Sequence, residues 1–185
     1  LLRTYTGHSR SVRSILITPD DKQVISASGK GIIKIWDWQK EEVLDILGSH
    51  NSSINAVNIT FCGKYLISAS SDKSLKIWDI QSRKLFQTLQ GHSESVNSIA
   101  ITSDNKYIIS GSDDKTIKIW DFQTGEENCT LSGHSDSVNS VVITPDNKYI
   151  ISGSDDKTIK IWNIKNEKEN FTLYGHKKTI NAITL

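Results

Sequence analysis

Three residue types that can carry out hydrolytic chemistry together recur along this chain at constant spacing. One such set is His92, Ser110 and Asp114. A serine activated by a histidine, which an aspartate orients in turn, is the arrangement of a serine hydrolase, although the serine must also be exposed and face an oxyanion site. Two further sets have the same spacing: His50, Ser68 and Asp72, and His134, Ser152 and Asp156. An active site needs to be built only once, so the repetition favours a structural role over a Ser-His-Asp hydrolase, which is kept as an alternative.

The histidines and tryptophans define a repeat. Both residue types recur every 42 positions: His8, His50, His92, His134 and His176, and Trp36, Trp78, Trp120 and Trp162. At this period the 185 residues hold about 4.4 units.

Each unit has the local signals of four short β-strands. In the third unit we expect strands over residues 96–102, 106–112, 116–121 and 128–131, with Asp104-Asn105 in the first turn. Ile117 and Ile119 alternate with Lys118, which is the period of two that a half-buried strand shows. These segments must position the histidines, serines and aspartates.

The order of motifs within a unit resembles the WD40 repeat family. In the third unit the motifs are Gly91-His92, Ser110, Asp114 and Trp120-Asp121, and most of them recur in the other units. The resemblance covers essentially the whole chain and implies an all-β fold, a β-propeller of four-stranded blades. Asn163 departs from the pattern by replacing the aspartate after Trp162.

The 42-residue period divides the chain into four complete blades, at residues 7–48, 49–90, 91–132 and 133–174. Residues 1–6 align with the outer strand of a preceding blade, and residues 175–185 begin a further one. Because the family usually closes its ring with about seven blades, we expect an incomplete ring. Unfinished blades offer open strand edges, so a self-associating module that completes a ring between chains is a second alternative function.

The resemblance implies a buried hydrogen-bonded network in each blade rather than a catalytic site. Lys30 stands where blade 1 should have its aspartate, and because a cation cannot accept these hydrogen bonds, blade 1 is predicted to be the weakest complete blade. The expected network residues are His8, Ser26 and Trp36 in blade 1; His50, Ser68, Asp72 and Trp78 in blade 2; His92, Ser110, Asp114 and Trp120 in blade 3; and His134, Ser152, Asp156 and Trp162 in blade 4.

Composition narrows the class of partner. A net charge of +1 gives no strong field for nucleic acid, and no apolar stretch approaches the roughly 18 residues of a membrane span. Five histidines on separate units favour neither a metal site nor a cofactor. Cys62 and Cys129 are expected to be free thiols in an intracellular, cytoplasmic chain.

The resemblance also implies a docking surface on the face that carries the turns between second and third strands and the entry to each first strand. We therefore expect a non-catalytic scaffold that binds a protein or peptide partner. Acidic positions in blades 3 and 4 lie between basic ends, which suits a partner with basic side chains. The candidate positions are Arg10, Arg13, Asn55, Ser71, Glu94, Asn97, Asp113, Asp136, Asn139 and Asp155, with Lys177 and Lys178 at the far basic end.

Overall fold

The protein was analysed as a computed structural model, which describes residues 4–40 and 42–185. Blade 1 consists of β1 (Val12–Ile17), β2 (Gln23–Ser28), β3 (Ile32–Asp37) and β4 (Glu42–Ser49). Blade 2 consists of β5 (Ile54–Ile59), β6 (Tyr65–Ser70), β7 (Ser74–Asp79) and β8 (Lys84–Gln90). Blade 3 consists of β9 (Val96–Ile101), β10 (Tyr107–Ser112), β11 (Thr116–Asp121) and β12 (Glu127–Ser132). Blade 4 consists of β13 (Val138–Ile143), β14 (Tyr149–Ser154), β15 (Ile159–Asn163) and β16 (Lys168–Leu173).

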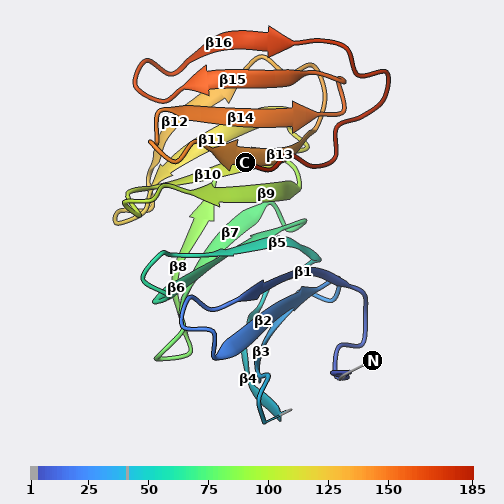
Figure 1. Ribbon diagram of the computed structural model, residues 1–185, viewed down its shortest axis with the longest axis vertical. Helices are drawn as coiled ribbons and strands as arrows, with labels where there is room; N and C mark the ends of the chain where they lie inside the picture. Colours follow the sequence, from blue (N-terminus) through green and yellow to red (C-terminus); the bar gives the residue numbers. More distant parts are fainter. Residues whose placement is uncertain (1–3, 41) are drawn as a thin grey trace.

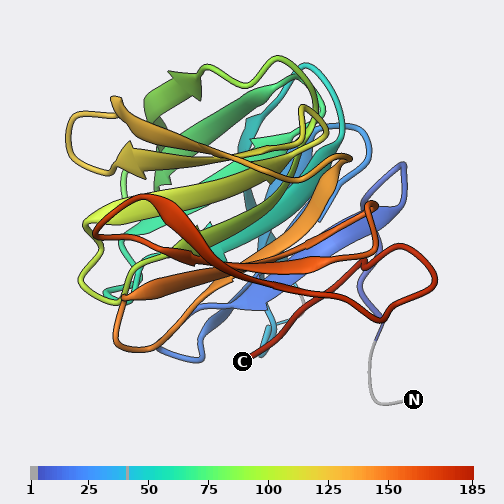
Figure 2. The same cartoon turned by 90° about the horizontal axis from the view of Figure 1, so that it is seen from above.

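The strands form four separate antiparallel sheets, each in sequential order. Figure 1 shows the sheets following one another in sequence order along the long axis, from blade 1 at the bottom to blade 4 at the top. Seen from above, the sheets overlap as a stack (Figure 2). The prediction of an all-β propeller with four four-stranded blades in an incomplete ring is confirmed.

Short-range turn chemistry sets the strand boundaries. In the turn between β9 and β10, the Asp104 carboxylate accepts a hydrogen bond from the Lys106 amide at 3.0 Å, and Asn105 has a φ of 56°. Asparagine tolerates this left-handed conformation better than most residues. The predicted turn at Asp104-Asn105 is confirmed, and the four strands of this blade begin and end within one residue of prediction.

The hydrophobic core lies between the blades. Ile67 and Leu89 of blade 2 pack in one buried cluster with Val96, Ile99 and Trp120 of blade 3. The same pattern joins blade 1 to blade 2 and blade 3 to blade 4. Neighbouring blades therefore stabilise each other by burying a shared apolar face, as expected of a repeat architecture.

The two flanking segments differ from complete blades. Residues 4–6 form no strand, and residues 1–3 of the expected outer strand lie outside the described residues. Residues 179–185 pair with no sheet, although they lie along blade 4 near β13 (Figure 1). In the described part of the chain, no helix is long and apolar enough to cross a membrane.

Candidate functional site

The Ser-His-Asp set of blade 3 is joined to a tryptophan in one buried network. The His92 ring lies 2.7 Å from Asp114 through Nδ1 and 2.8 Å from the Ser110 hydroxyl through Nε2. Trp120 Nε1 donates to the same hydroxyl at 2.9 Å. The network therefore ties the loop before β9 to strand β10, to the turn after it and to strand β11.

The protonation state of His92 follows from its neighbours. Burial lowers the pKa of His92, although the hydrogen bond that His92 donates to Asp114 opposes that effect. Since the Asp114 carboxylate only accepts, the neutral ring donates from Nδ1 and accepts the Ser110 proton at Nε2. Burial works to raise the pKa of Asp114, but hydrogen bonds from Thr116 and His92 outweigh it, and that pKa is lowered.

Blades 2 and 4 repeat this geometry. His50 Nδ1 is 2.9 Å from Asp72, and His134 Nδ1 is 2.7 Å from Asp156. His50 also contacts the Ser68 hydroxyl, which accepts a hydrogen bond from Trp78 Nε1. In the same way, His134 contacts the Ser152 hydroxyl, which accepts a hydrogen bond from Trp162 Nε1. The serines in all three networks are 0% exposed, so a substrate cannot reach their hydroxyls, and three identical copies have no catalytic purpose.

Blade 1 keeps only part of the network. His8 Nε2 is 2.6 Å from the Ser26 hydroxyl, and Trp36 Nε1 donates to that hydroxyl at 2.7 Å. Within the residues that the structure describes, His8 Nδ1 has no hydrogen-bond partner, and Lys30 is exposed. Burial lowers the pKa of His8, and the Lys34 charge lowers it further.

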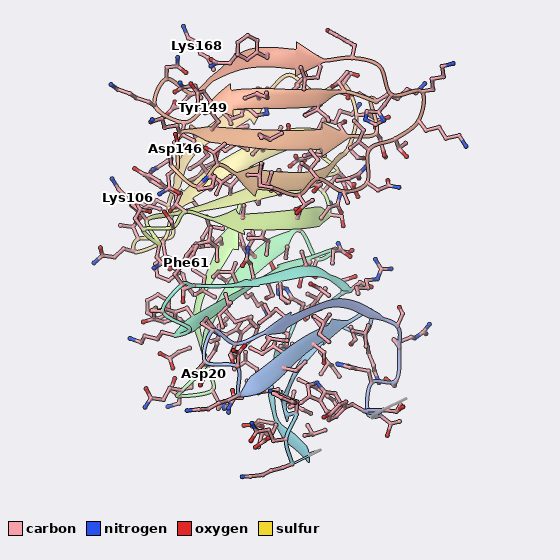
Figure 3. All side chains as sticks on the ribbon, viewed as in Figure 1. Asp20, Phe61, Lys106, Asp146, Tyr149 and Lys168 are labelled. Carbon is pink, nitrogen blue, oxygen red and sulfur yellow. The ribbon has the colours of Figure 1, made fainter. Side chains whose placement is uncertain are left out.

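The candidate docking face lies at one end of the strands. The turns between first and second strands, marked by Asp20, Phe61, Lys106 and Asp146, line the left side of Figure 3. Second strands run away from these turns, so the turns between second and third strands lie on the opposite side. Of the ten candidate positions, Arg10, Arg13, Glu94, Asp113 and Asp136 are exposed, and the other five are half-buried.

The candidate asparagines have a role inside the fold. Asn97 Nδ2 donates to Asp113 at 2.7 Å and to the Val138 carbonyl of the next blade at 3.2 Å. Asn139 makes the equivalent bonds to Asp155 at 2.6 Å and to the Ile180 carbonyl at 3.2 Å. These bonds hold Asp113 and Asp155 in defined positions at the face and connect each blade to the segment after it.

Lysines at the same face partly offset the acidic side chains. Lys73 Nζ lies 3.4 Å from Glu94 Oε1, and this exposed ion pair contributes little to the stability of the fold. Lys115 donates to the Ser135 carbonyl at 2.9 Å, and Lys157 is exposed in the turn between β14 and β15 that also holds Asp155. At the basic end, Arg13 donates to the Asn55 side chain at 3.1 Å.

Sequence reasoning missed a second set of contacts between blades. The Val57 amide donates to Ser14 Oγ, and the Val141 amide donates to Ser98 Oγ, each at 3.1 Å. The signal was a serine directly after the repeated Arg13 or Asn97, but nothing local distinguishes it from a surface serine.

Other side-chain chemistry is limited. In residues 4–40 and 42–185, no three His, Cys, Asp or Glu side chains are grouped so that they could hold a metal ion. Cys62 is an exposed free thiol and Cys129 a half-buried one. Burial raises the pKa of Cys129 to about 11, so this thiol is protonated at neutral pH.

The fold and the repeated networks define the class of protein: a segment of β-propeller built from tandem repeats. The family model described as "WD domain, G-beta repeat" matches residues 1–37, 41–79, 83–121 and 125–163. The chain therefore belongs to the WD40 repeat family, as its motifs predicted.

Among the proteins similar to this chain are one solved structure and one curated protein. A solved structure titled "Structure of U3-55K" superposes with a TM-score of 0.88 and 27% sequence identity, over 97% of this chain and 56% of that chain. The apoptotic protease-activating factor 1 of Rattus norvegicus is 47% identical over 36 residues, which are 20% of this chain and 3% of that protein. The chain thus spans little more than half of the solved relative and a small part of the curated one.

Proposed function

We propose that this chain is a non-catalytic scaffold that binds a protein or peptide partner on the face carrying the turns between second and third strands. WD40 propellers are generally protein-interaction scaffolds. The observation that carries the proposal is the pair of carboxylates, Asp113 and Asp155, each fixed by an asparagine at equivalent positions of adjacent blades. Side chains held in place lose less conformational entropy on binding.

The charge of this face favours a partner with basic side chains over blades 3 and 4. Because Glu94 is already close to Lys73, the carboxylates left for a partner are Asp113, Asp136 and Asp155. Arg10 and Arg13 on blade 1 would repel a basic segment and so fix its position. Complementary charge contributes mainly to association rate and specificity, and the net charge of +1 supports a protein partner over nucleic acid.

Synthetic peptides test this proposal directly. A series of labelled peptides with two lysines at varied separation is titrated with the chain, and binding is followed by fluorescence anisotropy. We expect at least one separation to bind, and Asp113→Lys with Asp155→Lys to weaken that binding about ten-fold or more at low salt, with less effect at high salt. The milder Asp113→Asn and Asp155→Asn pair removes the charges but keeps an oxygen that can accept from Asn97 and Asn139.

A matched control changes net charge equally at the other end of the strands. Glu126 and Glu167 are exposed and lie at the turns between third and fourth strands of blades 3 and 4. Glu126→Lys with Glu167→Lys should leave peptide binding within about two-fold of the unmodified chain. If the Asp113→Lys with Asp155→Lys pair and the Glu126→Lys with Glu167→Lys pair weaken peptide binding equally, the effect is due to net charge, and a defined docking face is refuted.

An intracellular, cytoplasmic location belongs to the same proposal. It is supported by the free thiols of Cys62 and Cys129, which are usual in a reducing compartment. Microscopy of the tagged chain in its own cell tests this location.

A further inference from the structure

Equivalent pockets lie at the three joints between the blades. Each lies at the end of the strands that carries the turns between first and second strands, opposite the candidate docking face (Figure 3). The pocket between blades 2 and 3, which we call the aromatic pocket, has a volume of about 690 Å³. Its lining includes Tyr65, Phe86, Phe122, Asp104, Lys106 and Asp121. Blades 2 and 3 each have another blade on their far side (Figure 1), so neither end of the chain forms part of this pocket.

Three aromatic rings form one wall of the aromatic pocket. The centroid of the Tyr65 ring lies 5.1 Å from that of Phe86 and 5.4 Å from that of Phe122. Tyr65 and Phe122 pack against the core cluster that joins blades 2 and 3. The Phe122 amide also donates to the Lys106 carbonyl at 2.9 Å. The rings are therefore held in place by the fold, while Phe86 stays 50% exposed.

Two carboxylates line the same pocket. Asp121 Oδ1 accepts from the amides of Gln123 and Thr124, each at 2.9 Å. Hydrogen bonds, above all the one from the Thr124 amide, lower the pKa of Asp121, so this carboxylate is charged at neutral pH. Asp104 Oδ1 accepts from the Lys106 amide at 3.0 Å. Backbone groups thus fix both carboxylates, and each can accept further bonds because an ionised carboxylate offers about four lone-pair sites.

The pocket between blades 3 and 4 has neither the phenylalanine rings nor the acidic lining. The repeat positions of Phe86, Phe122 and Asp121 are taken there by Asn128, Ile164 and Asn163. Its charged lining residues are two lysines and one glutamate, and those of the pocket between blades 1 and 2 are a lysine, an arginine and one aspartate. The aromatic pocket has two aspartates and one lysine. Among the three described pockets, it alone has a lining with net negative charge.

We propose that the aromatic pocket binds an arginine side chain of a protein partner. A guanidinium can lie flat on an exposed aromatic ring and at the same time donate to a carboxylate. The chain's own cations already contact tyrosine rings nearby. Lys64 Nζ lies 4.8 Å from the centre of the Tyr65 ring, and Lys106 Nζ lies 4.9 Å from the centre of the Tyr107 ring. Because both lysines lie over tyrosines, the two phenylalanine rings are left for the partner.

Short peptides test this site. The isotope-labelled chain is titrated with acetyl-Gly-Arg-Gly-amide, and the amide signals of Gln123 and Gly125 are followed by nuclear magnetic resonance. We expect saturable shifts with a Kd of about 1–5 mM, because one side chain makes few contacts. The citrulline peptide, whose side chain has the shape of arginine without its charge, should bind at least about ten-fold more weakly. The lysine peptide should bind at least about three-fold more weakly, because an ammonium cannot stack on a ring and pair with a carboxylate in two places.

Two variants copy residues that blade 4 has at the same repeat positions. Phe122→Ile removes one ring and introduces the side chain of Ile164. Asp121→Asn removes one charge and should keep the turn, because Asn163 Oδ1 accepts from the Lys165 amide at 2.9 Å. Each variant should weaken binding of the arginine peptide about five-fold or more.

Two controls leave the aromatic pocket intact. Phe171→Ser removes an exposed ring of β16 on blade 4, and Asp113→Asn with Asp155→Asn removes two charges from the docking face. Both should leave the Kd of the arginine peptide within about two-fold of that of the unmodified chain. A failure of this site and a failure of the docking face are therefore distinguishable.

Three results would overturn the proposal. They are the absence of saturable shifts up to about 20 mM arginine peptide, equal binding of the citrulline peptide, and unchanged binding by the Phe122→Ile and Asp121→Asn variants. If Phe122→Ile does not fold, Phe86→Asn replaces it and is judged by the same results. Phe86 is exposed, and Asn128 holds the same repeat position in blade 3.

Discussion

Replacing Ser110 by alanine tests whether the buried networks hold the blades together. The substitution leaves two buried groups without their partner, Trp120 Nε1 and His92 Nε2, which now meet at the Ser110 hydroxyl. An orphaned buried polar group costs about 1–3 kcal/mol. Since both groups share one hydroxyl, we expect a total loss of about 2–4 kcal/mol in the opening free energy of blade 3.

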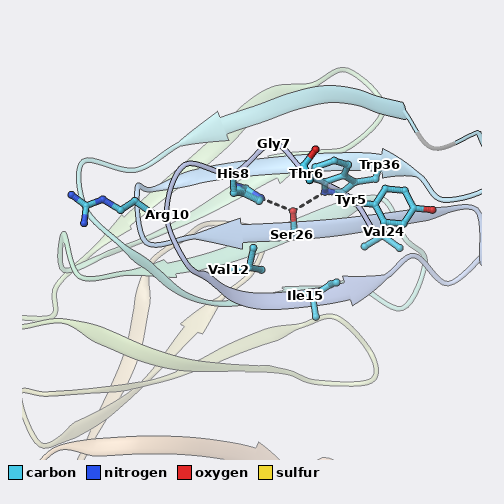
Figure 4. Close-up of a pocket in the computed structure, with 10 residues that line it drawn as sticks. All are labelled: Tyr5, Thr6, Gly7, His8, Arg10, Val12, Ile15, Val24, Ser26 and Trp36. Carbon is cyan, nitrogen blue, oxygen red and sulfur yellow. Dashed lines mark hydrogen bonds between the residues drawn. The ribbon is translucent and has the colours of Figure 1, made fainter. Parts of the chain in front are cut away.

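The equivalent substitution in blade 1, Ser26→Ala, is compared with Ser110→Ala. Ser26→Ala also orphans a buried tryptophan, Trp36, but His8 is half-buried beside the cavity of Figure 4 and can bind water instead. We therefore expect a loss of about 1–3 kcal/mol, at least about 1 kcal/mol smaller than for Ser110→Ala. Ser132→Ala, which removes an exposed hydroxyl of β12, should be within about 0.5 kcal/mol of the unmodified chain.

Native-state hydrogen exchange is the appropriate assay because tandem blades need not unfold in one step. At about 1.4 kcal/mol per ten-fold change, Ser110→Ala should lower the protection of β10 and β11 amides about 30- to 1,000-fold. If Ser110→Ala and Ser26→Ala lower amide protection equally, burial of the histidine does not determine how much stability the substitution removes. A loss within three-fold of Ser132→Ala would refute a structural role for the network.

Two further predictions follow from the same networks. Burial lowers the pKa of His50, His92 and His134. Below the pKa of about 6.5 that these histidines have in the unfolded chain, the unfolded chain therefore binds more protons than the folded chain. The free energy of unfolding should be constant between pH 7 and 8 and should fall from pH 6.5 to 5.5, by up to about 1.4 kcal/mol per pH unit for each histidine. Urea midpoints at pH 7.5, 6.5 and 5.5 measure this, and a midpoint that rises on acidification would contradict it. Lys30 replaces an aspartate, and within the described residues His8 Nδ1 has no hydrogen-bond partner. The amides of β1–β3 should therefore exchange faster than those of β9–β11. Equal protection of the two groups of amides would show that the missing carboxylate has no effect on the stability of blade 1.

Two asparagines of the candidate docking face, Asn97 and Asn139, make contacts that their positions in the repeat do not reveal. The sequence placed Asn97 and Asn139 among partner-binding candidates because they recur at the entry to each first strand. In the structure their amides donate to Asp113 and Asp155 and to the backbone of the next segment. They now serve the proposed docking face by fixing its carboxylates, a role that depends on a neighbouring blade and has no local signature.

Residues within one 42-residue unit were sufficient to predict the blades. Short runs rich in β-branched residues favour each strand, turn residues such as Asn105 set its ends, and the Gly-His and Trp-Asp motifs set the period, all through interactions within a unit. Contacts between units were decided only by tertiary structure. Asn97 meets a carbonyl 41 positions away and Ser98 an amide 43 positions away, because stacked blades bring those backbone groups together. Burial also depends on contacts between units: Val12 and Ile15 of blade 1 are exposed, whereas Val138 and Val141, at the same repeat positions of blade 4, are buried against blade 3.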